Sequence, residues 1–406
     1  MKFFLNKNGS GLSLLSCLQF VISVADWMLI VLLQIIVFDL TQSAFNIMLL
    51  VICELIPMLL FGAWAGAVAD RANLKQVLVW ACVVRLFIIM ALLVPAMRGQ
   101  LIPILVIAAL AAACNRFFVP AASALLPSLV SPDRLPAANA VIMGARMSGM
   151  AIGTLMAGVV ASHYGHVVAV AVIGVLLLLA SFLSALLPSN HVKREQLNEE
   201  SIWNDMRLAV SRYGVSLLLP MGASMFVMLA LGSFEILALI YVVQVLERPS
   251  ADVGLLFGAY GIGMLVGLTL SSWRRVMPQY GSWMLISLAL VCASIWGVSK
   301  VESLSLALPL VAVSGLAEGL IITLSLLRIY QQVAGDFYAR VIALLDTGTG
   351  AAFLLSVMLT GVIADEIPAH TLLGWLAMTL TGLLLLGIVT SALLQPKQNS
   401  VGKTES

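Results

Sequence analysis

Long apolar blocks alternate with short polar turns along the whole chain of 406 residues. Most blocks reach the length of about 20 residues that a helix needs to cross the hydrocarbon core of a bilayer. The pattern therefore predicts twelve membrane-spanning helices, at 11–39, 43–69, 74–97, 101–127, 137–162, 164–188, 215–243, 250–275, 279–299, 303–327, 340–364 and 370–394.

One polar connection is much longer than the others, and it divides the predicted spans into six and six. We therefore predict an all-α membrane protein with an N-terminal half (1–188), a cytoplasmic linker (189–212) and a C-terminal half with its tail (213–406). We interpret the linker as a solvated connection. The alternative is a short helix lying along the membrane surface on its apolar residues Ile202, Trp203, Met206 and Leu208.

Composition supports the membrane assignment. The chain is 62% hydrophobic and 10% charged, whereas soluble domains carry about 25% charged residues. A net charge of +2 gives no reason to expect a nucleic-acid partner. Lys2 and Lys7 precede an apolar run that is too long for a signal peptide, so we expect the first span to be retained.

The basic residues predict the orientation, because lysine and arginine concentrate on the cytoplasmic side. With the N-terminus inside, fifteen of the 21 basic residues fall in cytoplasmic segments or span ends. The outer loops hold three, Arg98, Arg248 and Lys300. Both termini are therefore predicted to be cytoplasmic.

The cysteines and histidines predict no metal site and no cofactor. All five cysteines fall in apolar runs without metal or redox spacing, which indicates buried, reduced, structural thiols: Cys17, Cys53, Cys82, Cys114 and Cys292. The four histidines fall in loops or at span ends. We find no nucleophile–base set and no phosphate-binding loop, so an enzyme is not predicted.

A dense polar turn follows the second span in the stretch GAWAGAVADRANLK, residues 62–75. Taken together, Gly66, Asp70, Arg71 and Lys75 resemble the loop between the second and third spans of the major facilitator superfamily. The family usually has a glycine and a basic residue where this chain has Asn73 and Leu74. The resemblance implies twelve spans in two six-helix halves.

The same resemblance implies that this turn is a gate. Asp70 would cap a nearby helix and bind a cytoplasmic arginine, for which Arg340 is the candidate, and so latch the outward-facing state. The alternative is that these charges only fix the topology.

Two further stretches resemble the drug:proton antiporter subgroup that contains macrolide-efflux pumps and enterobactin exporters. One is FFVPAASALLPSLVSPDRLPAANA, residues 117–140, and the other is LRIYQQVAGDFYARVIALLD, residues 327–346, which places Arg340 and Asp346 as in that subgroup. The resemblance implies a monomeric exporter in a bacterial inner membrane. The lysophospholipid flippases of the superfamily share the pattern around Asp26, so a flippase is the alternative.

Weak internal repetition also fits two related halves. GVVAS at 158–162 has a counterpart in GVIAD at 361–365, as expected of a transporter made of parallel repeats. Glycines at helical spacing predict close helix crossings, at Gly144, Gly149 and Gly153 and at Gly254, Gly258, Gly263 and Gly267.

Eight ionisable residues fall within the predicted spans. A charge exposed to lipid costs about 2.5 to 3.5 kcal/mol on insertion scales, so these residues are expected to face a polar interior: Asp26, Glu54, Arg85, Arg116, Arg146, Glu235, Glu318 and Asp346. In the first span, helical spacing puts five residues on one stripe, which indicates either the wall of a wet cavity or a hydrogen-bonded helix seam: Gln19, Ser23, Asp26, Ile30 and Gln34.

The acids are candidate proton sites. Glu54 lies one turn before the helix-kinking Pro57, and the alternative for it is an ion pair with an arginine. Asp26 is a further candidate. The C-terminal half has Glu235, Glu318 and Asp346 without a base deep in the membrane, which favours proton carriage there, although Asp346 is also placed to be a gate partner.

The candidate substrate-binding residues are Gln19, Asp26, Gln34, Asn115, Arg116 and Arg146. The planar forks of Arg116 and Arg146 suit an anionic group, and the alternative is that they neutralise Asp26 and Glu54. Arg85 is interpreted as one member of a structural ion pair.

The leading hypothesis is proton-coupled antiport that exports an amphipathic small molecule, a siderophore or a drug, by alternating access. The expected partners are that substrate, protons and membrane lipids. A membrane-embedded enzyme and a non-transporting receptor rank lower.

Overall fold

The structure is a computed structural model that describes residues 10–188, 199–271, 279–333 and 335–394. The described chain is helical, with three short 3-10 turns and the helices α1 (Ser10–Thr41), α2 (Ala44–Arg71), α3 (Leu74–Met90), α4 (Pro95–Arg98), α5 (Leu101–Leu129), α6 (Leu135–Leu186), α7 (Glu199–Gln244), α8 (Val253–Leu270), α9 (Tyr280–Val298), α10 (Leu304–Gln332), α11 (Gly335–Ile363) and α12 (Ala369–Leu394).

The helices account for the twelve predicted spans. Within the described residues, ten helices are long and apolar enough to cross a membrane. One of them, α6, has 52 residues and is broken at Gly165, where φ is 80°. At about 1.5 Å per residue an unbroken helix of this length would be far longer than a bilayer is thick, so α6 supplies two spans. The described apolar part of α2 is shorter, Ala44–Pro57.

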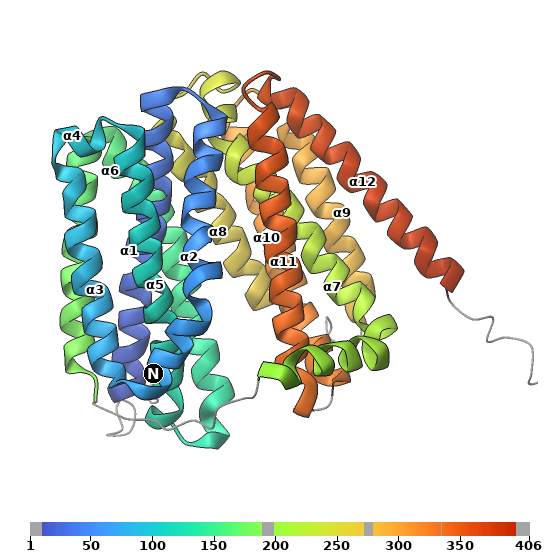
Figure 1. Cartoon of the computed structure of the whole chain (residues 1–406). Coiled ribbons are helices and arrows are strands. Elements are labelled where there is room, and N and C mark those ends of the chain that lie inside the picture. Colours follow the sequence, from blue (N-terminus) through green and yellow to red (C-terminus); the bar gives the residue numbers. More distant parts are fainter. Residues whose placement is uncertain (1–9, 189–198, 272–278, 334, 395–406) are drawn as a thin grey trace, which may run out of the picture.

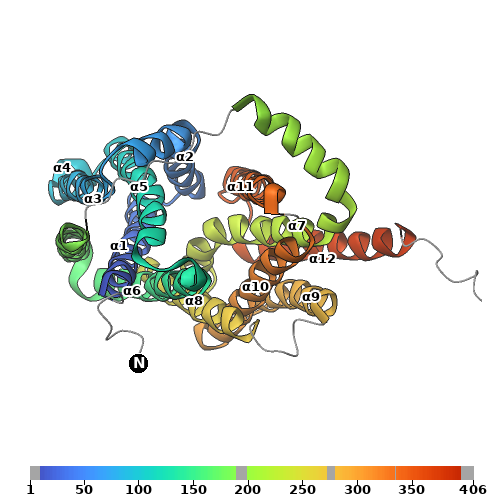
Figure 2. The same ribbon diagram turned by 90° about the horizontal axis from the view of Figure 1, so that it is seen from below.

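Two bundles make up the molecule, with α1–α6 in one and α7–α12 in the other (Figure 1). The start of α1 and the end of α12 both lie in the lower part of Figure 1, and α12 leans away from its neighbours. Seen from below, the two bundles stand side by side (Figure 2). The sequence predicts an all-helical membrane protein with twelve spans in two halves, and this prediction is confirmed.

Part of the predicted linker is helical. Of residues 189–212, the structure describes 199–212, and they form the first turns of α7. These turns run across the lower end of the bundle before α7 turns upward (Figure 1).

Glycines set the closest crossings inside each half. In the N-terminal half, a Cβ built on Gly149 would lie 2.7 Å from the side chain of Ser23, so α6 packs directly on α1. In the C-terminal half, α8 and α10 meet backbone to backbone, since a Cβ on Gly263 would strike the carbonyl of Ala312. The predicted tight crossings are present, except that Gly144 has no neighbour close enough to require a glycine.

The halves also touch through glycines. A Cβ on Gly254 of α8 would lie 2.8 Å from the Cα of Gly158 on α6, and a Cβ on Gly361 of α11 would strike the side chain of Met48 on α2. Both contacts lie toward the upper end of the molecule in Figure 1, opposite the start of α1. Toward the lower end of Figure 1, α2 and α11 diverge.

The α8–α10 crossing can be tested directly. Replacing Gly315 by alanine places a methyl group against the backbone carbonyl of Tyr260, and we expect it to lower the free energy of unfolding by about 1–3 kcal/mol, as overpacking does. Thermal unfolding in detergent measures this. The matched control is Gly374→Ala on α12, where a Cβ meets nothing within 4 Å. Equal stability of the two variants would contradict the proposed packing.

Candidate functional site

A cavity of about 230 Å³ lies between the two halves. Eight helices contribute to it, five from the N-terminal half and three from the C-terminal half. This central cavity is lined by Asp26, Trp27, Leu29, Ile30, Val51, Glu54, Leu55, Arg85, Ala108, Ala111, Ala112, Asn115, Arg116, Met150, Leu231, Glu235, Phe257, Tyr260 and Phe353. Its wall is therefore apolar with a few ionisable groups, which suits an amphipathic ligand.

One wall carries a buried ion pair. Arg85 on α3 binds Asp26 on α1, and their side chains are 6% and 17% exposed. The amide of Asn115 on α5 donates a second hydrogen bond to Asp26, with 3.2 Å between Nδ2 and Oδ2. The interpretation of Arg85 as one member of an ion pair is thus supported, and Asp26 is held by Arg85 and Asn115.

Arg116 follows Asn115 on α5 and also lines the central cavity. Its Nε is buried and has no hydrogen-bond partner within the described ranges. The structure records no ion pair to Arg116 among the residues it describes. A cationic fork next to a cavity and without a carboxylate partner is available to an anionic ligand.

Two acids face the cavity from opposite halves. Glu54 comes from α2 and Glu235 from α7, and they are close enough to interact electrostatically. Gln34 on α1 donates a hydrogen bond to Glu235, with 2.6 Å between Nε2 and Oε1, and this bond crosses between the halves. The buried Oε1 of Gln34 has no partner in the described part of the chain.

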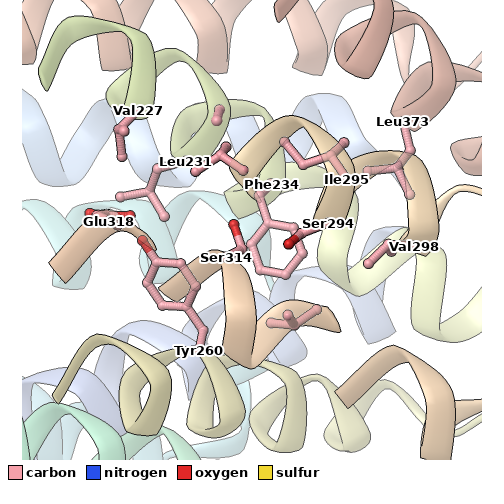
Figure 3. Close-up of a pocket in the computed structure, with 13 residues that line it drawn as sticks. Val227, Leu231, Phe234, Tyr260, Ser294, Ile295, Val298, Ser314, Glu318 and Leu373 are labelled. Carbon is pink, nitrogen blue, oxygen red and sulfur yellow. The ribbon is translucent and has the colours of Figure 1, made fainter. Parts of the chain in front are cut away.

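A second, smaller pocket of about 20 Å³ lies inside the C-terminal half. This C-terminal pocket is enclosed by α7, α8, α9, α10 and α12 and is lined by Val227, Ala230, Leu231, Phe234, Tyr260, Val291, Ser294, Ile295, Val298, Val311, Ser314, Glu318 and Leu373 (Figure 3). Glu318 is only 4% exposed, and neither an ion pair nor a hydrogen bond of its side chain is found among the described residues.

Four of the predicted binding and proton residues do not line either space, and they are Gln19, Gln34, Arg146 and Asp346. Gln19 is buried, and Arg146 is partly buried with its backbone carbonyl accepting a hydrogen bond of 2.7 Å from Ser23. The polar stripe of the first span is thus split. Ser23 lies in a seam with α6, Asp26 and Ile30 line the central cavity, and Gln34 is buried in its hydrogen bond to Glu235. Asp346 is exposed on α11 and lines none of the described pockets.

Most of the predicted gating residues are described by their backbone alone. Gly66, Asp70 and Arg71 belong to α2 and Arg340 to α11, and the side chains of Asp70, Arg71 and Arg340 are not among the described ones. Lys75 lies in the first turn of α3, where its backbone nitrogen donates to the side chain of Asn73 at 3.1 Å. The departure from the family pattern at Asn73 therefore provides a helix cap. Cys17, predicted to be buried, is exposed on α1.

A contact that the sequence does not predict joins the halves at the other end. Asp365, just beyond α11, accepts hydrogen bonds from the Ser43 hydroxyl at 2.6 Å and from the backbone nitrogens of Ala44 at 2.5 Å and Phe45 at 3.3 Å. A carboxylate at the positive end of α2 is stabilising. We call this contact the Asp365 latch. Asp365 is the last residue of the repeat GVIAD, but nothing in the sequence indicates that its side chain would contact the start of α2.

Tyr260 is also absent from the sequence predictions, yet it lines both the central cavity and the C-terminal pocket. Its hydroxyl is buried and has no partner among the described residues. Apart from its place next to the glycines of α8, nothing in the sequence distinguishes it from a packing tyrosine.

Two helical halves around a shared cavity with a few ionisable groups are typical of secondary active transporters. The sequence matches the Major Facilitator Superfamily over residues 15–295. The chain therefore belongs to this superfamily, whose members are transporters and not enzymes. No individually curated protein matches the sequence at a significant level.

Solved structures agree on the fold. A point mutant of the nucleoside transporter NupG is 12% identical with a TM-score of 0.75, covering 93% of this chain and 99% of that one. A POT family transporter in complex with 5-aminolevulinic acid is 11% identical with a TM-score of 0.75, covering 96% and 98%. A bacterial homologue of the human lysosomal transporter Spinster is 13% identical with a TM-score of 0.67, covering 95% of each chain.

Proposed function

We propose that this transporter is a proton-coupled antiporter that exports an amphipathic small molecule carrying an anionic group. One observation carries the proposal. The central cavity combines a guanidinium without a carboxylate partner, on Arg116, with two acids that form no ion pair among the described residues, Glu54 and Glu235. The subgroup resemblance of the sequence points to the same activity.

The opposite charges suggest how substrate and protons exchange. The anionic group of the substrate binds Arg116, and its apolar part lies against the apolar wall that includes Trp27, Phe257 and Phe353. Protons bind Glu54 and Glu235. Protonating Glu235 changes its hydrogen bond with Gln34, so proton binding acts on a contact between the halves. Asp26 is held by Arg85 and contributes to the binding surface.

The direction follows from the proposed topology, with both termini in the cytoplasm of a bacterium. The Asp365 latch lies at the opposite end and would then close the outer side. The conformation is therefore proposed to face inward, ready to take up cytoplasmic substrate. Gly66, Asp70, Arg71, Lys75 and Arg340 remain proposed as the inner gate, and Asp346 as a further proton or gate residue.

A lysophospholipid flippase is the second candidate, and one observation favours it. A groove of about 350 Å³ lies between α7, α11 and α12, lined by exposed apolar side chains that suit an acyl chain, among them Leu359, Trp375 and Leu383. A flippase would move labelled lysophosphatidylglycerol between leaflets without a proton gradient.

The experiment uses the full chain in liposomes with an imposed pH gradient. We expect an amphipathic anion, 8-anilinonaphthalene-1-sulfonate, to move against the proton flow, and an internal pH dye to report the protons. Arg116→Gln should weaken transport of this anion at least about tenfold, the loss expected for a charge-assisted fork. Arg98→Gln, on a short outer helix that does not line the central cavity, is the matched control. Transport indifferent to the pH gradient would overturn the proposal.

A further inference from the structure

The central cavity and the C-terminal pocket share two residues at their boundary. Tyr260 lines both spaces, and so does Leu231. Of these two, only Tyr260 carries a polar group. The ring of Tyr260 rises from α8 with its hydroxyl directed toward Glu318 (Figure 3). Tyr260 is thus the polar residue shared by the pocket that holds Glu318 and the cavity that holds Glu54 and Glu235.

Two polar groups at this boundary have no partner among the residues that the structure describes. The Tyr260 hydroxyl is buried without a hydrogen bond there, and the buried Glu318 side chain forms none of the ion pairs or hydrogen bonds found in the described chain. Buried polar groups are nearly always hydrogen-bonded, to protein or to an ordered water. The C-terminal pocket measures about 20 Å³, and a water molecule needs roughly 10 to 15 Å³. The pocket therefore has room for one water molecule, and Tyr260 and Glu318 are both among the residues that line it.

The surrounding packing keeps these groups together. Phe234 stacks on the Tyr260 ring, with centroids 6.2 Å apart and an angle of 26° between the planes. Gly315 lies directly against the Tyr260 carbonyl, and no side chain fits between α8 and α10 there. Since Glu318 follows Gly315 by about one helical turn, the close crossing places the acid next to the tyrosine.

We propose that Tyr260 conducts protons between Glu318 and the carboxylates of the central cavity, through one water molecule held in the C-terminal pocket. This inference rests on the proposed proton coupling and deepens it. Glu318 becomes a store for the proton, away from the substrate. The titratable and charged groups facing Tyr260 are Glu318 on one side and Asp26, Glu54, Arg85, Arg116 and Glu235 on the other.

The transfer is balanced at each atom. Protonated Glu318 gives its proton to the water, and the water passes a proton to the Tyr260 oxygen. The original hydroxyl proton of Tyr260 leaves at the same time for the carboxylate of Glu235 or Glu54. One O–H bond forms and one breaks on the tyrosine, which carries no charge afterwards. Phenylalanine at this position keeps the ring and its stacking but has no hydroxyl group to accept and release a proton.

The test compares two kinds of transport by the full chain in liposomes. Transport of 8-anilinonaphthalene-1-sulfonate driven by a pH gradient needs net proton movement, whereas exchange of labelled for unlabelled probe at equal pH does not. We expect Tyr260→Phe to lower gradient-driven transport at least about tenfold, in line with the loss of a proton-transfer group. Exchange should remain near the wild-type rate. Glu318→Gln should show the same pattern.

A second tyrosine provides the control. Tyr241 is also buried in the C-terminal half, and its hydroxyl donates to the Val301 carbonyl at 2.7 Å, away from both spaces. Tyr241→Phe removes a satisfied hydrogen bond and should leave the coupling unchanged. Tyr260→Phe should change the melting temperature less than Tyr241→Phe does, because it breaks no hydrogen bond to another described residue.

The outcomes separate the two proposals. If wild-type transport ignores the pH gradient, the proposed function itself is wrong. If wild-type transport is coupled and Tyr260→Phe is equally coupled, only the conducting role of Tyr260 is overturned. Loss of exchange together with gradient-driven transport would also overturn it, since the tyrosine would then be part of the binding site.

Discussion

Replacing Arg85 by alanine is expected to lower the free energy of unfolding by about 3–5 kcal/mol, the cost of leaving a buried charge without its partner. Asp26 would keep only the hydrogen bond from Asn115, in a cavity wall that is mostly apolar. We also expect the variant to lose transport, because the central cavity would carry an uncompensated negative charge next to the anion site. Thermal unfolding in detergent and transport in liposomes measure the two effects.

Two control variants test whether the effect comes from the buried ion pair or from the loss of any arginine. Arg248→Ala breaks an exposed pair with Asp252 at 2.7 Å, in which the arginine is 53% exposed, and exposed pairs contribute only about 0–1 kcal/mol. The double variant Arg85→Ala with Asp26→Asn removes both charges and should recover much of the stability. If Arg85→Ala is as stable as the wild type, Arg85 does not hold Asp26 in place.

The second large effect is expected at the Asp365 latch. Asp365→Ala removes three hydrogen bonds to the start of α2. Helix caps of this kind contribute about 0.5–2 kcal/mol, and about 1.4 kcal/mol changes a population tenfold. We therefore expect a shift of about tenfold toward conformations in which the upper ends of α2 and α11 separate.

The measurement is a distance distribution between spin labels at Leu40 and Glu366, which are exposed on opposite halves. A cysteine-free background is needed. Asp39→Asn is the control, because Asp39 pairs with His166 at 3.3 Å within the N-terminal half. An unchanged distribution in Asp365→Ala would mean that the latch does not hold the halves together.

The fold could be predicted from the sequence because a membrane-spanning helix is recognised by its length and its apolar composition alone. Length, hydropathy and the placement of basic residues decide the spans, and the predicted break between the fifth and sixth lies one or two residues from Gly165. The predicted glycine crossings are also right where a partner helix exists. The prediction at Gly144 is wrong because helical spacing alone does not say which face of α6 meets a neighbour.

The sequence indicates which ionisable residues are candidates but not how they pair. Asp26, Glu54, Arg116 and Glu235 are expected to face an interior space, and they line one cavity. Which arginine binds Asp26 depends on helix rotation and tilt, which leave no pattern in one sequence. Tyr260 could not be predicted as a site residue from the sequence. What distinguishes it is a buried hydroxyl without a partner among the described residues, and this is visible only in the structure.

The contact between Gly158 and Gly254 affects the rate at which the two halves can change their relative orientation. Two backbones meet there without intervening side chains, so this crossing has no side-chain rotamers to rearrange when the halves move. The hydrogen bonds of Asp365 and of Gln34 with Glu235 also join the halves. Asp365 does not line the central cavity, so a substitution there would change the turnover rate without touching the substrate.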